Sequence, residues 1–182
     1  MSELNYMSWI GGVDLFAATS GSSQPNAIVH VARAVTTPLG TAPSGLIFFH
    51  PDPNAPPLFY GFICTDPEIG AYYGPKIFAG TPFENAPVLP ATIEITETPT
   101  IATARVTIEG YVIETTLTGF GPMQRIDRGI GTPMPFTQQG VEAEASEIAL
   151  IVNGEPIALT ALPYSIELGG ASVWSPGGTY TH

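Results

Sequence analysis

Cysteine and histidine are scarce in this chain, and the shortage argues against two kinds of site. Cys64 is the only cysteine among the 182 residues, so the sequence predicts no disulfide within the chain and no thiolate cluster for zinc. The three histidines, at positions 30, 50 and 182, are far apart in the sequence, and a metal site would need at least two of them to converge with carboxylates. We therefore expect no native metal site.

Positive charge is also scarce. Five Lys and Arg residues stand against 16 Asp and Glu, and the net charge of −11 repels the phosphates of nucleic acids and anionic membrane surfaces. Only 12% of residues are charged, while 44% are hydrophobic. Because monomers rarely expose large apolar patches, either a ligand cavity or a partner subunit must cover this apolar surface. We expect a homo-oligomer, a small-molecule ligand, and no nucleic-acid partner.

Long apolar runs are missing as well. No stretch of about 18 or more apolar residues occurs, so the sequence predicts no transmembrane helix and no membrane insertion. The first positive charge is Arg33, so the opening segment lacks the basic region of a secretory signal peptide. These absences favour a cytoplasmic protein, or one whose signal has already been removed.

The familiar cofactor and nucleophile signatures are absent from the sequence. It contains no Walker loop, no Gly-x-Gly-x-x-Gly after a strand, no Gly-x-Ser-x-Gly elbow, no His-Glu-x-x-His pair and no EF-hand loop. Any catalysis would therefore depend on ordinary acid–base side chains, and we expect no cofactor.

Two tight hairpins are the clearest feature that is present. Both turns contain residues that tolerate the positive φ angles of a two-residue β-turn. The first turn is Glu109-Gly110, between strands predicted at 101–108 and 111–118. The second is Asn153-Gly154, between strands predicted at 147–152 and 155–161.

The first hairpin also predicts its own register. If Ile108 faces Tyr111, then Val106 faces Ile113 on an apolar face, and Arg105 faces Glu114 on the polar face. We therefore expect one side of this hairpin to pack against a core.

Further segments are strand-sized and apolar. They are residues 27–37, 46–49, 58–65 and 88–96. Residues 141–150 have a helical composition, but Val and Ala alternate there with Glu, and we interpret them as a strand with at most one helical turn.

These elements predict an all-β protein with a single domain over residues 1–182. We expect about eight to ten strands in an antiparallel β-barrel, with a two-sheet β-sandwich or jelly roll as the alternative. Residues 1–25 and 175–182 have a flexible composition, although the first of these segments also suits a short strand or arm. Gly119 to Gly140 is predicted to be a long irregular connection that borders the functional site.

Two histidines, one aspartate and two tyrosines are the candidate catalytic residues. His50 and Asp52 follow a predicted strand and would form an acid–base pair or, alternatively, cap a surface loop. His30 lies on a predicted strand among apolar residues, where it would act as a base of lowered pKa or be an ordinary core histidine. Tyr72 and Tyr73 would orient a substrate.

Five charged residues are candidate ligand-binding groups. Arg125 and Arg128 would receive an anionic ligand group or pair with acids of the chain. Arg105 and Glu114 would line a barrel lumen or form an exposed pair that contributes about 0 to 1 kcal/mol. Lys76, the only lysine, would anchor a charge or form a Schiff base if buried, and would otherwise lie at the surface.

The function that these observations favour is a β-barrel that binds a hydrophobic small molecule in an apolar cavity. If the protein is an enzyme, we expect a cofactor-independent isomerase, cyclase or lyase, because such reactions need only a shaped cavity and one or two acid–base groups. The alternative is a structural protein that assembles with itself, as a coat, decoration or filament subunit. A sandwich that binds carbohydrate or protein through Tyr and Trp side chains is a third interpretation.

Overall fold

A computed structural model describes residues 6–130, 136–163 and 171–181. Within these ranges the chain is almost entirely β-structure, with one helix, so the predicted all-β class is confirmed. The helix is α1 (Pro67–Ile77). The strands are β1 (Tyr6–Thr19), β2 (Ala27–Thr37), β3 (Gly40–Phe49), β4 (Phe59–Cys64), β5 (Val88–Pro90), β6 (Thr92–Glu97), β7 (Ile101–Ile108), β8 (Tyr111–Phe120), β9 (Gln124–Arg128), β10 (Thr137–Val152), β11 (Glu155–Ile157), β12 (Leu159–Ala161) and β13 (Val173–Thr181).

The strands form one continuous sheet in the order β5-β4-β3-β2-β1-β13-β10-β8-β7-β6. Strands β9 and β11 also pair with β10, and β12 pairs with β1. All of these pairs are antiparallel except β4 with β5. Among the described strands the sheet does not close on itself, so the predicted barrel closure is not confirmed.

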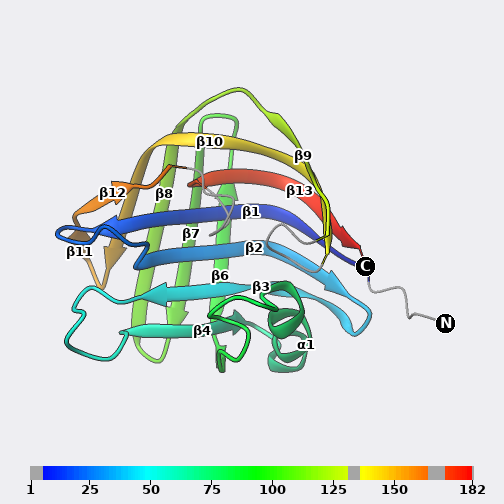
Figure 1. Cartoon of the computed structure of the whole chain (residues 1–182), viewed down its shortest axis with the longest axis horizontal. Helices are drawn as coiled ribbons and strands as arrows, with labels where there is room; N and C mark the ends of the chain where they lie inside the picture. The colour runs from blue at the N-terminus through cyan, green and yellow to red at the C-terminus, as the bar shows by residue number, and fades with distance from the viewer. Residues whose placement is uncertain (1–5, 131–135, 164–170, 182) are drawn as a thin grey trace.

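The sheet is folded into two layers by its longest strand, β10. Its first half, up to Glu144, pairs with β13 and β9, whereas its second half, from Ala145, pairs with β8 and β11. Figure 1 shows β6, β7 and β8 running across the direction of β1, β2 and β3. Apolar side chains from both layers meet in one buried cluster, which includes Leu15, Val29 and Leu117 and forms the main core.

A change in side-chain alternation in β1 determines which residues face this core. Met7 and Trp9 point to the outer face of the layer, whereas Val13 and Leu15 point to the core. The shift by one residue occurs at Gly11, whose φ of 69° lies in the left-handed region that favours glycine. As a result Asp14 lies on the outer face together with Trp9, and its carboxylate is kept out of the core.

The two predicted hairpins are confirmed. In the first, Val106 pairs with Ile113, Ile108 with Tyr111, and Arg105 with Glu114. All four turn residues, Glu109-Gly110 and Asn153-Gly154, have positive φ angles, as a type I′ turn requires. The return of the second hairpin is split: β11 pairs with β10, but β12 leaves it to pair with β1.

Helix α1 was not expected from the sequence. Asp66 caps its N-terminus by accepting hydrogen bonds from the backbone N–H groups of Glu68 and Ile69, and Pro67 occupies the first turn, where its missing N–H matters little. Gly70 and Gly74 lower the helix propensity of this segment, but both lie where the helix packs closely against its neighbours. A Cβ on Gly74 would overlap the ring of Phe62 on β4, so this glycine lets the helix approach the sheet closely.

Three other expectations need correction. The segment from Gly119 to Gly140 is not wholly irregular, because it contains β9 and the start of β10; residues 131–135 lie outside the described ranges. Residues 6–19 and 173–181 are paired strands rather than loose ends, and they lie side by side as β1 and β13 near the middle of the sheet (Figure 1). The described strands also outnumber the eight to ten expected.

Candidate functional site

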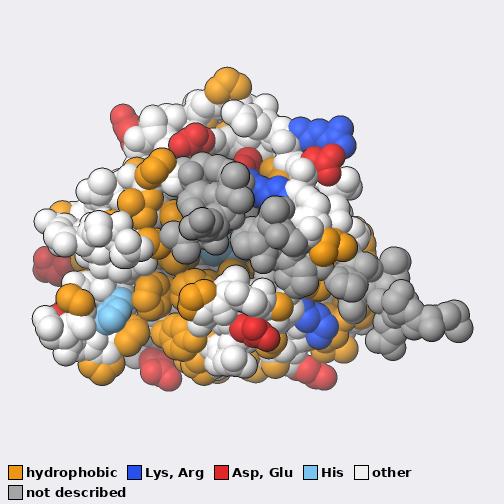
Figure 2. Space-filling model, viewed as in Figure 1, with side chains coloured by type: hydrophobic (Ala, Val, Ile, Leu, Met, Phe, Trp, Pro, Cys, Tyr) orange, Lys and Arg blue, Asp and Glu red, His pale blue; other side chains and the backbone are white. Residues whose placement is uncertain are grey.

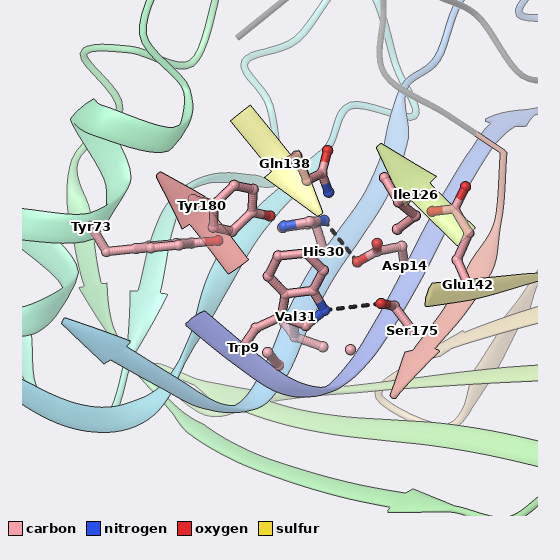
Figure 3. A pocket seen from close by; sticks show the side chains of 12 residues that line it. Trp9, Asp14, His30, Val31, Tyr73, Ile126, Gln138, Glu142, Ser175 and Tyr180 are labelled. Atoms are coloured by element: carbon pink, nitrogen blue, oxygen red, sulfur yellow. Dashed lines mark hydrogen bonds and ion pairs between the residues drawn. The ribbon is translucent and has the colours of Figure 1, made fainter. Parts of the chain in front are cut away.

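A small pocket lies on the outer face of the first layer, opposite the main core. Strands β1, β2, β9, β10 and β13 contribute residues to it, and α1 contributes Tyr73 (Figure 3). Its free volume is about 20 Å³, which is enough for about one water molecule. Polar and ionisable groups line much of it, unlike the core on the other side of the same strands.

Asp14 and His30 form the centre of the pocket. They face each other in the register of β1 and β2, which places both side chains on the same side of the sheet. His30 Nδ1 lies 2.7 Å from Asp14 Oδ1, and the two side chains are 30% and 22% exposed. Because Nδ1–H donates to the carboxylate, neutral His30 has its free lone pair on Nε2, which has no hydrogen-bond partner among the described residues.

The protonation of His30 is governed by its partner. Burial disfavours the charged imidazolium, but the negative charge of Asp14 and the hydrogen bond to it outweigh that effect. The pKa of His30 is therefore raised above its ordinary value of 6.5. The lowered pKa expected for His30 is wrong, because Asp14 faces His30 in addition to the apolar residues of its own strand.

Two tyrosine hydroxyls reach the pocket without a partner. Tyr73 and Tyr180 are 2% and 3% exposed, and neither hydroxyl makes a hydrogen bond with any described residue. Figure 3 shows both hydroxyl groups directed toward the side of the pocket where the His30 ring lies. Burial, together with the charge of Asp14, raises the pKa of each phenol, so both remain protonated near neutral pH and are available as hydrogen-bond donors.

Glu142 and Gln138 form another part of the pocket wall, and Arg128 binds both. Arg128 donates through one guanidinium nitrogen to Glu142 Oε1 at 2.9 Å and through the other to Gln138 Oε1 at 3.1 Å. Burial raises the pKa of Glu142 above its ordinary value, and the charge of Arg128 opposes this rise. Both side chains are about three-quarters buried, so the pair is held more firmly than an exposed one.

Trp9 and Ser175 form a structural part of the wall. The indole N–H of Trp9 donates to Ser175 Oγ at 2.9 Å, and Ser175 Oγ donates to the carbonyl oxygen of Val141 at 2.7 Å. The proton of Ser175 is therefore already committed, and no hydrogen bond links this hydroxyl to His30. These contacts argue against Ser175 as a nucleophile activated by His30.

The Trp9 ring fixes Tyr180 in place. The two ring centroids are 4.6 Å apart, which is a favourable distance for aromatic packing. Gly178 leaves the space that the Trp9 ring occupies, because a Cβ there would overlap the indole. Trp9 therefore positions the phenol rather than contacting a ligand through a free polar atom.

The structure brings some of the sequence-predicted residues to this pocket and leaves others elsewhere. His30 and Tyr73 line it, and Arg128 reaches it through Glu142. His50 and Asp52 share an exposed loop but do not pair: His50 Nε2 lies 2.7 Å from the carbonyl oxygen of Ala55, and Asp52 accepts from the backbone of Asn54.

The remaining candidates lie outside the pocket. Lys76 lies over the Tyr72 ring, with Nζ 3.7 Å from the ring centroid. Arg105 and Glu114 face each other across β7 and β8. The exposed Arg125 pairs with Asp127 at 3.2 Å. Their predicted roles in ligand binding remain predictions.

Sequence reasoning missed Asp14, Tyr180, Gln138 and Glu142. Asp14 carried a usable signal, because it is an acid inside the apolar run from Trp9 to Phe16. The other three are brought to the pocket by long-range strand pairing, and nothing in their local sequence marks them.

Comparisons with known proteins assign the chain to no family, and they point to no cofactor. Searches of family models, of curated proteins and of solved structures found nothing that matches the chain. The described residues contain no group of three or more His, Cys, Asp or Glu side chains placed to hold a metal ion. Over the same ranges, no helix has the length and apolar character needed to cross a membrane.

Proposed function

We propose that the pocket is the acid–base site of a cofactor-independent enzyme that moves a proton next to a carbonyl group, as isomerases and lyases do. The observation that carries this proposal is the set of three polar atoms without partners at one pocket: His30 Nε2 and the hydroxyls of Tyr73 and Tyr180. Most polar groups inside a protein are hydrogen-bonded, so polar atoms that open onto a pocket without a protein partner are available to a ligand.

Each of these groups suits one part of such a reaction. Neutral His30 removes a proton from the carbon beside the carbonyl through Nε2, and the charge of Asp14 stabilises the imidazolium that forms. The electrons of the broken C–H bond move to the carbonyl oxygen, which becomes an enolate oxygen. The phenols of Tyr73 and Tyr180 donate hydrogen bonds to that oxygen. The imidazolium then returns the proton to the same carbon or, in a conjugated dienolate, to the far carbon of the conjugated system, so the reaction needs no redox partner.

The size of the pocket limits how a substrate enters. A free volume of about 20 Å³ receives only the reacting end of a molecule. The hydrophobic metabolite expected from the sequence would therefore place its carbonyl end between His30 and the tyrosines and leave the remainder at the mouth. This geometry supports a proton-transfer site more than a deep apolar cavity.

Proton exchange tests this proposal without knowledge of the natural substrate. Hydroxyacetone is incubated with the protein in D₂O, and loss of its C–H signals next to the carbonyl is followed by NMR. Wild type should accelerate the exchange. His30→Gln should slow it by about 10² to 10⁴, and Tyr73→Phe or Tyr180→Phe by about a hundredfold.

Two matched variants serve as controls. His50→Gln removes an imidazole from the exposed loop, and Tyr60→Phe removes a hydroxyl that donates to Pro82; neither should change the rate. The Tyr73→Phe and Tyr180→Phe proteins should unfold at the same temperature as wild type or higher, since the lost hydroxyl had no partner. Exchange in wild type no faster than in His30→Gln would refute the proposal.

A structural subunit remains the second candidate, and one surface favours it. Phe48, Tyr60 and Phe83 form a half-exposed aromatic cluster beside β3 and β4. Figure 2 shows apolar side chains gathered over these strands. Such a patch would be covered in a homo-oligomer. Sedimentation as a clean monomer at micromolar concentration, before and after Phe48→Ser, would contradict this candidate.

A further inference from the structure

Neighbouring strands of the first layer become irregular at the same level, next to the pocket. In β1 the alternation of side chains shifts at Gly11. The pairing of β2 with β3 shifts just after Ala32, and the pairing of β10 with β13 shifts just after Val141. Strand register brings these positions side by side across the layer. Bulges of this kind bend strands and redirect side chains, and here they immediately precede the pairing of Asp14 with His30.

Glu97 reaches this irregular line from the second layer. It is the last residue of β6, and its side chain is 19% exposed. Arg33 on β2 donates to Glu97 Oε1 at 3.2 Å, and the indole N–H of Trp174 on β13 donates to Glu97 Oε2 at 2.7 Å. A Cβ on Gly11 would lie 3.1 Å from Arg33 Nε and 3.2 Å from Glu97 Oε1, so this glycine lets the ion pair rest directly on β1. One carboxylate therefore joins the two strands that flank β1.

This Glu97 cluster, made of Glu97, Arg33 and Trp174, is connected to the pocket through the strands themselves. Trp174 pairs with Val13, the residue before Asp14 on β1. Arg33 follows His30 by three positions on β2. Val13 and Trp174 pack with the main core, whereas the side chains of Asp14 and His30 lie on the pocket side of the same strands. Both strands that carry the acid–base pair are thus held from the core side.

We propose that Glu97 is a positioning residue, which holds β1, β2 and β13 in the arrangement that places Asp14 against His30. The effect on catalysis rests on the proposed proton-transfer function, whereas the effect on the Asp14–His30 pair does not. Loss of the Glu97 cluster should let the irregular strand segments relax and lengthen the 2.7 Å contact between His30 Nδ1 and Asp14 Oδ1. A displacement of about 1 Å is enough to slow a reaction by about a hundredfold.

The protonation of His30 reports on this role directly. An NMR titration of its imidazole, identified by the signals that are lost in His30→Gln, measures the pKa in each variant. If the contact with Asp14 loosens, the pKa should fall from its raised value toward 6.5. Glu97→Gln, Arg33→Gln and Trp174→Phe should all lower it. The titratable groups that face His30 are kept in all three variants: Asp14 on β1, Tyr73 on α1, Glu142 on β10 and Tyr180 on β13.

These three variants separate positioning from a direct effect of charge. Charge alone would make Glu97→Gln lower the pKa of His30 and Arg33→Gln raise it. Trp174→Phe changes no charge, keeps an aromatic ring and removes only the donor to Glu97. Glu94→Gln, at an exposed position of the same strand, removes the same charge as Glu97→Gln and should leave the pKa unchanged. Arg33 is 53% exposed, so Arg33→Gln should fold even if the other variants do not.

Exchange of hydroxyacetone protons in D₂O connects the Glu97 cluster to the proposed function. Glu97→Gln, Arg33→Gln and Trp174→Phe should each slow it by about tenfold or more, and Glu94→Gln should exchange at the wild-type rate. A pKa of His30 that is unchanged in Trp174→Phe, or raised in Arg33→Gln, would overturn the positioning role.

The two proposals can fail separately. If all three variants lower the pKa of His30 but wild type exchanges no faster than His30→Gln, the positioning of the pair is supported and the proton-transfer function is wrong. If wild type exchanges faster than His30→Gln and the three variants match wild type in both rate and pKa, the function stands and the positioning role of Glu97 is wrong.

Discussion

Strands β1 and β2 have one face in the main core and the other at the pocket. The core face is apolar, whereas the pocket face carries polar and ionisable side chains. Val13 and Leu15 are fully buried between the layers, whereas Asp14, between them in sequence, bonds His30 on the outer face. The core face of the opposite layer contains one buried hydroxyl without a partner, Thr115. On the pocket face, the hydroxyls of Tyr73 and Tyr180 make no hydrogen bond with a described residue but open onto the pocket, beside His30 Nε2.

A polar group without a partner has different consequences on the two faces. An unpartnered hydroxyl surrounded by apolar side chains only destabilises the fold, because nothing can reach it. The same group at the edge of a pocket is available to a ligand. The inner face should therefore respond strongly to changes of volume, and the outer face to changes of charge and pH.

The largest effect should come from the inner face. Leu15→Ala removes a fully buried side chain from the main core and should lower the free energy of unfolding by about 2 to 5 kcal/mol. Leu39→Ala, at a leucine that is half exposed, should change it by no more than about 0.5 kcal/mol. Urea titrations of both proteins measure the difference. Equal losses would mean that the two layers do not pack as described.

Removing the orphan hydroxyl of the core should stabilise the protein. Thr115→Val keeps the shape of the side chain, deletes a buried hydroxyl that has no partner, and should raise the free energy of unfolding by about 1 kcal/mol. Thr118 offers a matched comparison on the same strand, because its hydroxyl donates to Glu147 at 2.9 Å. Thr118→Val should therefore give no gain. A loss of stability in Thr115→Val would reveal an unseen partner for that hydroxyl.

The outer face should make stability depend on pH. Because the pKa of His30 is higher in the folded chain than its ordinary value of 6.5, the folded state binds more protons between those two pKa values. The stabilisation is complete below pH 6.5 and is lost as the pH rises through the folded-state pKa. Its size is limited by the partial exposure of both side chains.

Unfolding measured from pH 5.5 to 9 tests this pH dependence in three proteins. His30→Gln should remove the decline, whereas His50→Gln, in the exposed loop, should keep it. The groups that face His30, namely Asp14, Tyr73, Tyr180 and Glu142, are unchanged in both variants. A decline that persists in His30→Gln would assign it to another group.

The smallest effect is expected at the predicted cross-strand pair. Arg105 faces Glu114 on the outer side of β7 and β8, where the arginine is exposed to water. Arg105→Ala should change the free energy of unfolding by no more than about 0.5 kcal/mol. A double-mutant cycle with Glu114→Ala measures the coupling directly. A coupling above about 1 kcal/mol would indicate that water is excluded from this face.

Local information was enough to predict the first hairpin down to its register. The turn residues and the alternation from Ile101 to Thr118 lie within one short segment, so nothing distant was needed. The same is true of β10, where alternation of Val and Ala with Glu correctly overrode its helical composition. Local information did not predict helix α1, because Gly74 and Pro75 lower helix propensity. The reason for a glycine at position 74 is its close packing against Phe62, which the local sequence does not reveal.

The site could be predicted only in part. His30 was a candidate because an imidazole among apolar residues of a strand is unusual. Its partner Asp14 depends on the register between β1 and β2 and on the shift in alternation at Gly11, and neither follows from composition. Tyr180 and Glu142 join the pocket from distant strands, so finding them requires the topology of the whole sheet.

The pairing of β1 with β13 also has a consequence for how the protein is made. Trp9 and Ser175, which are bonded across these strands, are 166 positions apart in the chain. Contacts of such long range form slowly, and during synthesis the edge of β1 that pairs with β13 stays open until β13 has left the ribosome. A chain interrupted before residue 173 would contain most of the core strands but would lack Tyr180. The proposed proton-transfer site therefore cannot form before Tyr180 has been synthesised.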